Sequence, residues 1–294
     1  MSVIEELESA IATVAERAGP SIVGIGRRRR GSGVVIANGA VLTNAHNLRG
    51  DEVTVGFADG RSAVGRVSAA DFDGDVAVVA VDTADAPAVA WAGGEQPRVG
   101  TVVFGAAATS GGGTRMTVGT VSSVARAFRG PGGRRIAGSI EHTAPLAPGS
   151  SGGALLDADG GLLGINTNRV GEGFYLALPA DAALRERVDA LSRGQAPARP
   201  RLGVAIAPSH VARRLRRSVG LPEREGLLVR GVEDVSAASR AGIREGDLIV
   251  AVGATEVTDG DALLDALAAA SAPFQVSLVR GTEDLTVTVD ATDA

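Results

Sequence analysis

The sequence predicts a mainly β protein, in which a β-barrel or β-sandwich domain is followed by a small α+β domain. From Ser21 to about Phe174, short β-branched runs alternate with Gly, Asp and Asn turns, and no long helical pattern intervenes. After a stretch containing Gly194, Pro197 and Pro200, helical and strand patterns are mixed. The length of 294 residues favours about two domains.

In the first half, residues 2–18 are expected to form a helix because Ile4, Leu7, Ile11 and Val14 recur at helical spacing. Gly19-Pro20 would end this helix, and a second helix is expected from Asp181. The strands expected between them are 21–25, 33–36, 41–43, 53–57, 76–81, 102–104 and 116–124. The expected organisation is a helical segment over 1–19, a β domain over 20–191, a linker over 192–200 and an α+β domain over 201–294.

The second domain is expected to combine five strands and three short helices. The strands are 202–206, 227–232, 248–252, 275–279 and 285–289, and the helices are 209–219, 236–241 and 261–270.

Composition excludes several classes of function. A net charge of -5 argues against a nucleic-acid partner. The absence of cysteine excludes disulfides, thiolate metal sites and cysteine catalysis. No His, Asp and Glu residues have metal-ligand spacing, so neither a metal nor another cofactor is expected.

The N-terminus starts acidic and lacks the basic-then-apolar profile of a signal peptide. No apolar run reaches the roughly 18 residues that a membrane span needs. The expectation is a cytoplasmic protein, or an exported one whose leader has been removed.

A serine nucleophile is predicted in the turn Ala147-Pro-Gly-Ser-Ser-Gly-Gly-Ala-Leu155. Ser151 is the expected nucleophile because Gly149 stands two positions before it and Gly152-Gly153 follow. A turn at Gly149, Ser150 and Ser151 would form an oxyanion hole, with the N–H groups of Gly149 and Ser151 aimed at the developing charge.

A serine needs a base and a group that orients the base. Leu42-Thr-Asn-Ala-His46 supplies His46 at the end of a strand, and Asp75 directly precedes the buried strand at 76–81. The chain order His, Asp, Ser is that of the chymotrypsin-type β-barrel proteases, so the sequence predicts a peptidase.

An alternative interpretation is an esterase, because Gly149–Gly153 also matches the Gly-x-Ser-x-Gly nucleophile elbow. That elbow needs a helix after the serine and then Asp and His in order. Here the following residues, 154–165, resemble a hairpin, and the only later histidine is His210. The peptidase interpretation is therefore favoured.

The chain resembles the HtrA (DegP-like) serine proteases, which carry a chymotrypsin-like double β-barrel followed by a PDZ domain. The segments that carry the resemblance are 31–36, 42–46, 75–79, 148–155, 162–167 and 173–179. The resemblance places the catalytic triad on His46, Asp75 and Ser151. It implies ATP-independent cleavage of unfolded or signal proteins in protein quality control and the stress response.

The sequence departs from this family at several positions. Ser150 and Ala154 replace the usual Asn and Pro, His142-Thr143-Ala144 replaces Thr-Asp-Ala, and Asn47 replaces the Val that usually follows the histidine. The family commonly forms trimers through aromatic residues near the N-terminus, but this chain has no aromatic residue before Phe57. A homo-oligomer is thus an open expectation.

The resemblance also implies an apolar specificity pocket. A preference for basic residues needs a carboxylate six positions before the serine, and that position is Pro145, next to Leu146. The pocket wall would come from Asn166 to Phe174. Cleavage is expected after small or medium apolar residues.

The second domain is expected to bind peptide C-termini. Leu202, Gly203 and Val204 resemble the carboxylate-binding loop and strand of PDZ domains, where a peptide adds as an extra strand. Leu263 and Leu267 would line the groove, or they would belong to the core. An alternative function for the whole chain is an inactive or latent peptide-binding or chaperone module on the same scaffold.

Overall fold

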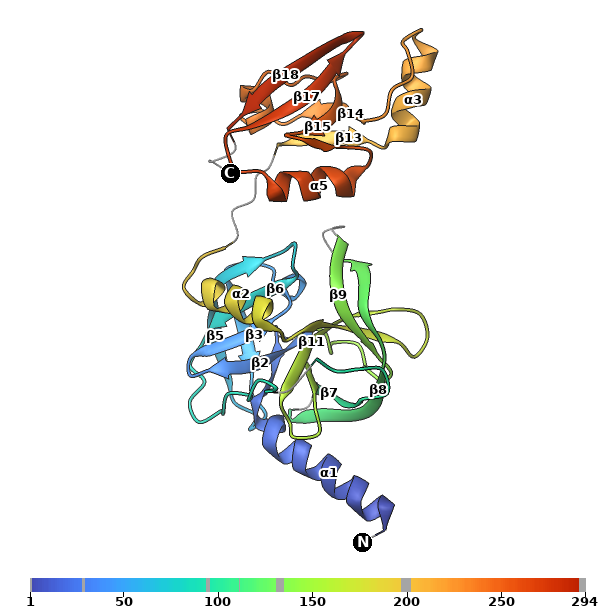
Figure 1. The fold of residues 1–294 in the computed structure, drawn as a ribbon. Coiled ribbons are helices and arrows are strands. Elements are labelled where there is room, and N and C mark those ends of the chain that lie inside the picture. The colour runs from blue at the N-terminus through green and yellow to red at the C-terminus, as the bar shows by residue number, and fades with distance from the viewer. Residues whose placement is uncertain are drawn as a thin grey trace. The chain divides into compact units, whose positions relative to one another are not determined.

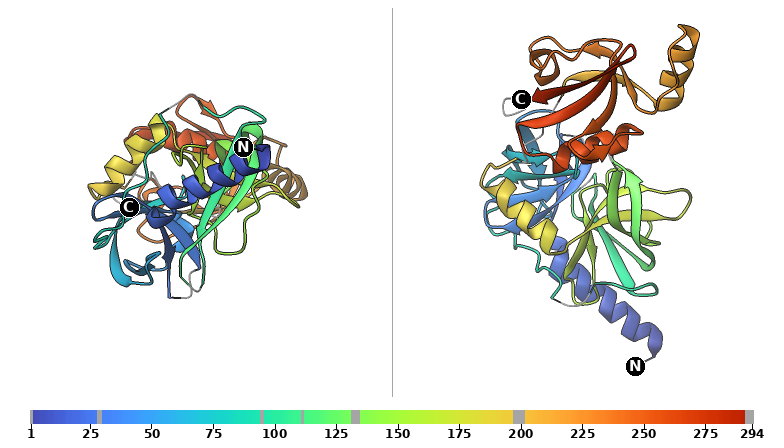
Figure 2. Two further views of the ribbon diagram at one scale, coloured as in Figure 1. Left: turned by 90° about the horizontal axis from the view of Figure 1, so that it is seen from below. Right: turned by 45° about the horizontal axis from the view of Figure 1, so that its top comes forward.

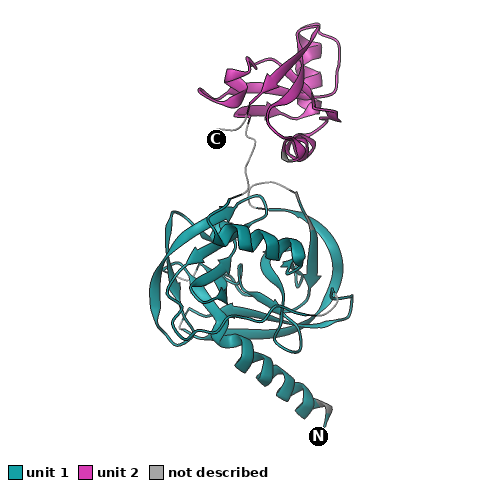
Figure 3. Cartoon of the chain, turned by 60° about the vertical axis from the view of Figure 1, so that its left-hand side comes forward, with its two compact units in different colours: residues 1–196 teal, residues 197–294 magenta. Residues whose placement is uncertain are grey.

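The computed structural model describes residues 2–27, 30–93, 96–110, 112–130, 135–196 and 202–290. The chain divides into two compact units, Met1–Ala196 and Pro197–Ala294 (Figure 3). The division falls inside the segment 192–200 that was predicted to be a linker.

The first unit contains two closed six-stranded barrels (Figure 1), which confirms the predicted mainly β, chymotrypsin-like fold. In the first barrel the strands follow the order β1-β2-β3-β6-β5-β4. Their bounds are β1 Ile22–Ile25, β2 Gly31–Ala37, β3 Ala40–Thr43, β4 Glu52–Gly56, β5 Ser62–Asp71 and β6 Val76–Ala80.

The second barrel follows the order β10-β11-β12-β9-β8-β7. Its strands are β7 Val102–Ala108, β8 Thr114–Arg129, β9 Arg135–His142, β10 Ala154–Leu156, β11 Leu162–Arg169 and β12 Tyr175–Pro179. The nucleophile turn predicted at 147–153 is the connection from β9 to β10.

One apolar core joins the two barrels. It combines Leu42 and Val78 of the first barrel with Phe104 and Leu156 of the second, all fully buried or nearly so. Removing a buried leucine side chain typically costs about 2–5 kcal/mol. The interface between the barrels is therefore a buried apolar core, as the interior of each barrel is.

Two α-helices and two 3-10 turns accompany the barrels in the part of the first unit that the structure describes. Helix α1 (Val3–Ala18) begins with a capping box between Ser2 and Glu5, and its first half extends away from the barrels (Figure 1 and the right-hand view of Figure 2). Two short 3-10 turns are η1 (Gly19–Ser21) and η2 (Ala45–Asn47). Helix α2 (Ala182–Ser192) is capped by Asp181 and packs against β5 and β6.

The second unit is a mainly antiparallel sheet of six strands in the order β13-β14-β15-β17-β18, with β16 paired to β15. The strands are β13 Val204–Ala207, β14 Leu227–Val232, β15 Leu248–Val252, β16 Thr255–Glu256, β17 Phe274–Arg280 and β18 Glu283–Val289. The helices are α3 Ser209–Ser218, α4 Ala237–Arg240 and α5 Gly260–Ala269. This unit has its own apolar core, which includes Val229, Ile249 and Leu278.

Candidate active site

His46 and Asp75 form a paired base and acid at the edge of the first barrel. His46 lies on the turn η2, three residues beyond the end of β3 and not at the strand end where the sequence placed it. Its Nδ1 lies 2.9 Å from both carboxylate oxygens of Asp75, and its backbone N–H donates to Oδ1 over 3.1 Å. A carboxylate only accepts, so Nδ1 carries the proton and Nε2 is left to act as an acceptor.

The carboxylate of Asp75 is held by further contacts. Asp75 is 1% exposed and adopts a left-handed φ of 54°, a conformation that is costly for a residue with a side chain. Asn44 Nδ2 donates to the Asp75 carbonyl over 2.8 Å, and Thr167 Oγ1 donates to Oδ2 over 2.9 Å. The carboxylate therefore accepts from Thr167 as well as from His46, which fixes its direction toward the imidazole.

The backbone of the nucleophile turn leaves two N–H groups for an incoming oxygen. Ser150 N–H donates to Ala147 O, Gly152 N–H to Asn166 O and Gly153 N–H to Ser150 O. The N–H groups of Gly149 and Ser151 have no acceptor in the described part of the chain. Both residues are half-buried, and N–H groups without an internal acceptor are available to a bound oxygen, so these two can serve an oxyanion. Ser150 N–H, which the sequence also placed in the oxyanion hole, is already in use.

The hydroxyl of Ser151 is turned away from the base. Ser151 Oγ donates to the carbonyl of Thr167 on β11 over 2.8 Å, and none of the hydrogen bonds among the described residues joins it to His46. Thr167 thus contacts both the acid, through its side chain, and the nucleophile, through its backbone. In this arrangement the proton of Ser151 Oγ is used by the Thr167 carbonyl and not by His46 Nε2.

The residues predicted to form the specificity pocket differ in their exposure and in their contacts. Pro145 and Phe174 are exposed, and Leu146 is half-buried. Asn166 is fully buried: its Nδ2 donates to Ala154 O over 2.8 Å, and its Oδ1 lies 3.1 Å from His142 Nε2. Among the described contacts, none connects Asn166 with Pro145, Leu146 or Phe174. The side chain of Asn166 supports the strand behind the nucleophile turn.

His142 is a buried histidine behind this site. Its ring stacks on Tyr175 at a centroid distance of 5.9 Å. Burial lowers the pKa of His142 to about 4, although the hydrogen bond to Asn166 acts in the opposite direction. Because Asn166 Oδ1 accepts, His142 is neutral with its proton on Nε2. Its Nδ1 has no hydrogen-bond partner among the described residues.

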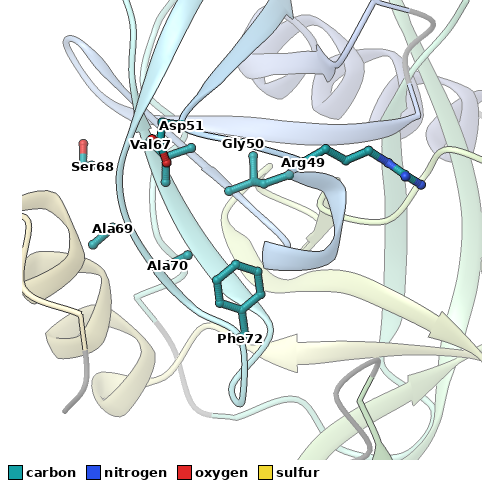
Figure 4. Close-up of a pocket in the computed structure, with 9 residues that line it drawn as sticks. Arg49, Gly50, Asp51, Val67, Ser68, Ala69, Ala70 and Phe72 are labelled. Atoms are coloured by element: carbon teal, nitrogen blue, oxygen red, sulfur yellow. The ribbon is translucent and has the colours of Figure 1, made fainter. Parts of the chain in front are cut away.

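A hollow of about 530 Å³ lies next to the histidine and aspartate segments (Figure 4). Leu48–Asp51, which follow His46, form one part of its lining. Val67–Ala70 and Phe72, which precede Asp75, form the other. The ring of Phe72 is half exposed there.

In the second unit, Leu202 and Gly203 form a loop in front of β13. Their carbonyls accept from Ala238 N–H over 2.8 Å and Glu233 N–H over 2.9 Å, while their N–H groups have no acceptor among the described residues. Val204 opens β13, which is an edge strand of the sheet. Leu263 and Leu267 on α5 are buried in the core of this unit.

Two properties of the described ranges bear on cofactors and membranes. No three His, Asp or Glu side chains there gather closely enough to hold a metal ion. None of the helices there combines the length and the hydropathy that a membrane span requires.

The sequence marks Asn47 only as a departure from the family, and no spacing rule singles out Asn44, Thr167 or Ser32. Asn44 and Thr167 lie in segments that carry the family resemblance, but the sequence does not show which of their atoms contact Asp75. The contacts of Asn47, Thr167 and Ser32 depend on how the two barrels pack together.

Comparison with known proteins agrees with this geometry. Residues 31–165 match the trypsin-like peptidase domain, and residues 228–279 match the PDZ domain. The chain is 32% identical over 276 residues to a probable periplasmic serine endoprotease DegP-like of Halomonas elongata, covering 91% of this chain and 57% of the relative. It is 31% identical over 277 residues to the putative serine protease HhoA of Synechocystis, covering 88% of this chain and 70% of the relative.

Solved structures give the same result over almost the whole chain. The HtrA-type protease AlgW with a decapeptide matches with a TM-score of 0.71 and 26% identity, covering 95% of this chain and 97% of that one. A serine endoprotease from Yersinia pestis matches with a TM-score of 0.69 and 26% identity, covering 97% and 98% of the two chains. The chain spans 57% of the length of its Halomonas relative. With both domains matched in order, the chain belongs to the HtrA family of trypsin-like serine proteases with a PDZ domain.

Proposed function

We propose that this chain is a serine endopeptidase in which Ser151 is the nucleophile, His46 the general base and Asp75 the group that orients His46. The observation that carries the proposal is the His46–Asp75 pair at 2.9 Å, together with a nucleophile turn that leaves the N–H groups of Gly149 and Ser151 free. These are the parts that acyl transfer by a serine requires.

The reaction follows from this geometry. Ser151 Oγ leaves the Thr167 carbonyl, gives its proton to His46 Nε2 and attacks the scissile carbonyl. The oxyanion of the tetrahedral intermediate accepts from Gly149 N–H and Ser151 N–H, a contribution worth roughly a hundred- to a thousandfold in rate per donor. His46 then protonates the leaving amine, and a water activated by His46 hydrolyses the acyl-enzyme.

The proposed substrates are unfolded proteins or peptides cleaved after small or medium apolar residues. Position 145, where a preference for basic residues would need a carboxylate, is a proline, which supports an apolar specificity pocket. Export is proposed because the Halomonas relative carries the name of a periplasmic endoprotease.

The second unit is proposed to bind peptide C-termini. The free N–H groups of Leu202 and Gly203 can donate to a carboxylate, and the edge strand β13 can pair with an extended peptide. The HtrA-type protease AlgW, which matches over almost the whole chain, has been solved with a decapeptide.

Labelling by a fluorophosphonate tests the catalytic proposal, because this probe reacts only with an activated serine. Intact-mass analysis should show one adduct on the wild-type chain and none on Ser151→Ala. The His46→Ala variant should react at least about a thousandfold more slowly. The control is His210→Ala, which removes an exposed histidine of the second unit and should react like the wild type.

A second candidate function is a latent or inactive peptide-binding module. The bond from Ser151 Oγ to Thr167 O favours it, because the nucleophile is held away from its base. Labelling that appears only when a peptide with an apolar C-terminus is added would indicate latency. The absence of labelling under both conditions, with retained peptide binding, would indicate an inactive module.

A further inference from the structure

We infer that Asn47 is a positioning residue that holds the nucleophile turn in register with the base. The inference rests on the proposed function, since it assigns the nucleophile to Ser151 and the base to His46. Asn47 follows His46 directly on the turn η2, so one short segment carries both side chains.

The side-chain amide of Asn47 reaches from the first barrel to the nucleophile itself. Its Nδ2 donates to the carbonyl of Ser151 over 2.9 Å and to Thr43 Oγ1 over 3.0 Å. An amide nitrogen carries two hydrogens, so both of its donor positions are used. Asn47 is 8% exposed, and an amide so deeply buried keeps such bonds because water does not replace them.

The Ser151 carbonyl has a second donor from the same barrel. Ser32 N–H donates to it over 2.8 Å, and Ser32 Oγ donates to the carbonyl of Gly149 over 2.9 Å. Both carbonyls are thus directed toward the first barrel. They belong to the peptide units Gly149–Ser150 and Ser151–Gly152, which flank the unit that carries Ser151 N–H, so the turn is held on both sides of that donor.

The turn is also in close contact with this barrel. Gly152 has a φ of 87°, and a Cβ atom there would lie 2.1 Å from Ser32 O and 2.9 Å from Asn47 Nδ2. The nucleophile turn therefore packs directly against β2, β3 and Asn47 with no room for a side chain. Asn47 sits at the point where the two barrels meet.

These contacts fix the peptide plane after the nucleophile at both ends. Asn47 and Ser32 hold its carbonyl, and Gly152 N–H donates to Asn166 O over 2.7 Å. The valine that usually stands at this position in the family has no donor to offer. In this chain, the separation of His46 and Ser151 is consequently set in part by the amide of Asn47.

Two substitutions test the inference. Asn47→Val removes the donor, and Asn47→Asp keeps the size while replacing the donor by an acceptor. Each should slow fluorophosphonate labelling of Ser151 and lower kcat by about tenfold, the effect expected for the loss of one hydrogen bond. The KM for a peptide substrate should stay within about twofold, because the side-chain bonds of Asn47 go to Thr43 and Ser151 and not to Asn166–Phe174, the segment expected to form the wall of the specificity pocket.

The pH profile separates positioning from a general disturbance of the site. Asn47 makes no hydrogen bond with the imidazole of His46, and Asn47→Val adds no charge, so the pH midpoint of labelling should not change in this variant, which is the one compared with the wild type. The matched control is Asn38→Asp, the same chemical change in the exposed β2–β3 hairpin, which should label like the wild type. Rates are compared well below the thermal midpoint of each variant.

Hydrogen exchange provides a readout that does not need activity. Exchange at Gly152 N–H should be at least about fivefold faster in both Asn47 variants than in the wild type, since one anchor of the turn is lost. Unchanged labelling or unchanged exchange would overturn the inference, and so would a loss of activity that appears in KM or in the pH midpoint. If the wild type takes up no probe, the proposed function fails, and exchange alone decides whether Asn47 holds the turn.

Discussion

The imidazole of His142 lies fully buried behind the nucleophile turn, in contact with Asn166 and Tyr175. Burial lowers its pKa from 6.5 to about 4 in the folded protein. Between these two pH values, His142 is mostly neutral in the folded protein and mostly protonated in the unfolded chain. The stability that this group contributes is fully present above about pH 6.5 and falls as the pH drops toward 4, where the loss levels off.

The size of this effect can be measured against a variant that cannot titrate. His142→Gln keeps a donor for Asn166 but has no ionisable group. Between about pH 7 and pH 4, the free energy of unfolding of the wild type should fall by about 3 kcal/mol more than that of the variant. Chemical denaturation at several pH values measures both curves, and parallel curves would contradict a buried neutral His142.

At the level of residues, the sequence predicted the triad because each member has a local signature: glycines around Ser151, a strand end before His46 and a buried strand after Asp75. Thr167 and Asn47 have no such signature. Each acts through a contact with a distant segment, Thr167 with Asp75 and Asn47 with Ser151. Such contacts exist only once the barrels have packed together.

At the level of elements, strands rich in β-branched residues were easy to predict, and polar or glycine-containing ones were not. The buried run of β6 was found, whereas β5 and β9, which contain Gly65 and Gly138 among polar residues, were not among the expected strands. The apolar strand β12 was also not among them. The strand predicted at 202–206 begins at Val204, because Gly203 has a left-handed φ of 74° that breaks the extended conformation. That break forms the loop to which we assign carboxylate binding.

The loop gives a prediction for peptide binding. A Cβ atom at Gly203 would lie 2.4 Å from the Cβ of Ser236, and a left-handed φ is costly for any residue with a side chain. Gly203→Ala should therefore distort the N–H groups of the loop and weaken binding of a peptide with a free C-terminus by at least about tenfold. Fluorescence anisotropy with a labelled apolar peptide measures the Kd.

A matched glycine variant makes this result specific. Gly231→Ala places the same methyl group on β14, where the nearest atom, Ala205 Cβ, is 3.8 Å away, and it should bind like the wild type. An amidated peptide should bind weakly to all forms. Equal affinities of the Gly203 and Gly231 variants would contradict the assignment of the loop.

At the level of the whole molecule, the two units have separate apolar cores. The change in composition along the chain predicted this division, because a linker rich in Pro and Gly separates two kinds of strand pattern. Separate cores imply separate cooperative transitions. The groups proposed to be catalytic all lie in the first unit, so the chemistry at Ser151 is expected to be independent of whether the second unit is folded.

Core substitutions in each unit test this independence. Leu278→Ala removes a fully buried side chain of the second unit and should lower the stability of that unit by about 2–5 kcal/mol. This variant should lower the temperature of one of two calorimetric transitions. Its rate of labelling by the fluorophosphonate should stay within about twofold of the wild-type rate. Leu156→Ala, equally buried in the core shared by the barrels, should shift the other transition, and labelling should fall as that unit unfolds. A slower reaction at Ser151 in the Leu278 variant would instead show that the second unit must be folded for the nucleophile to react.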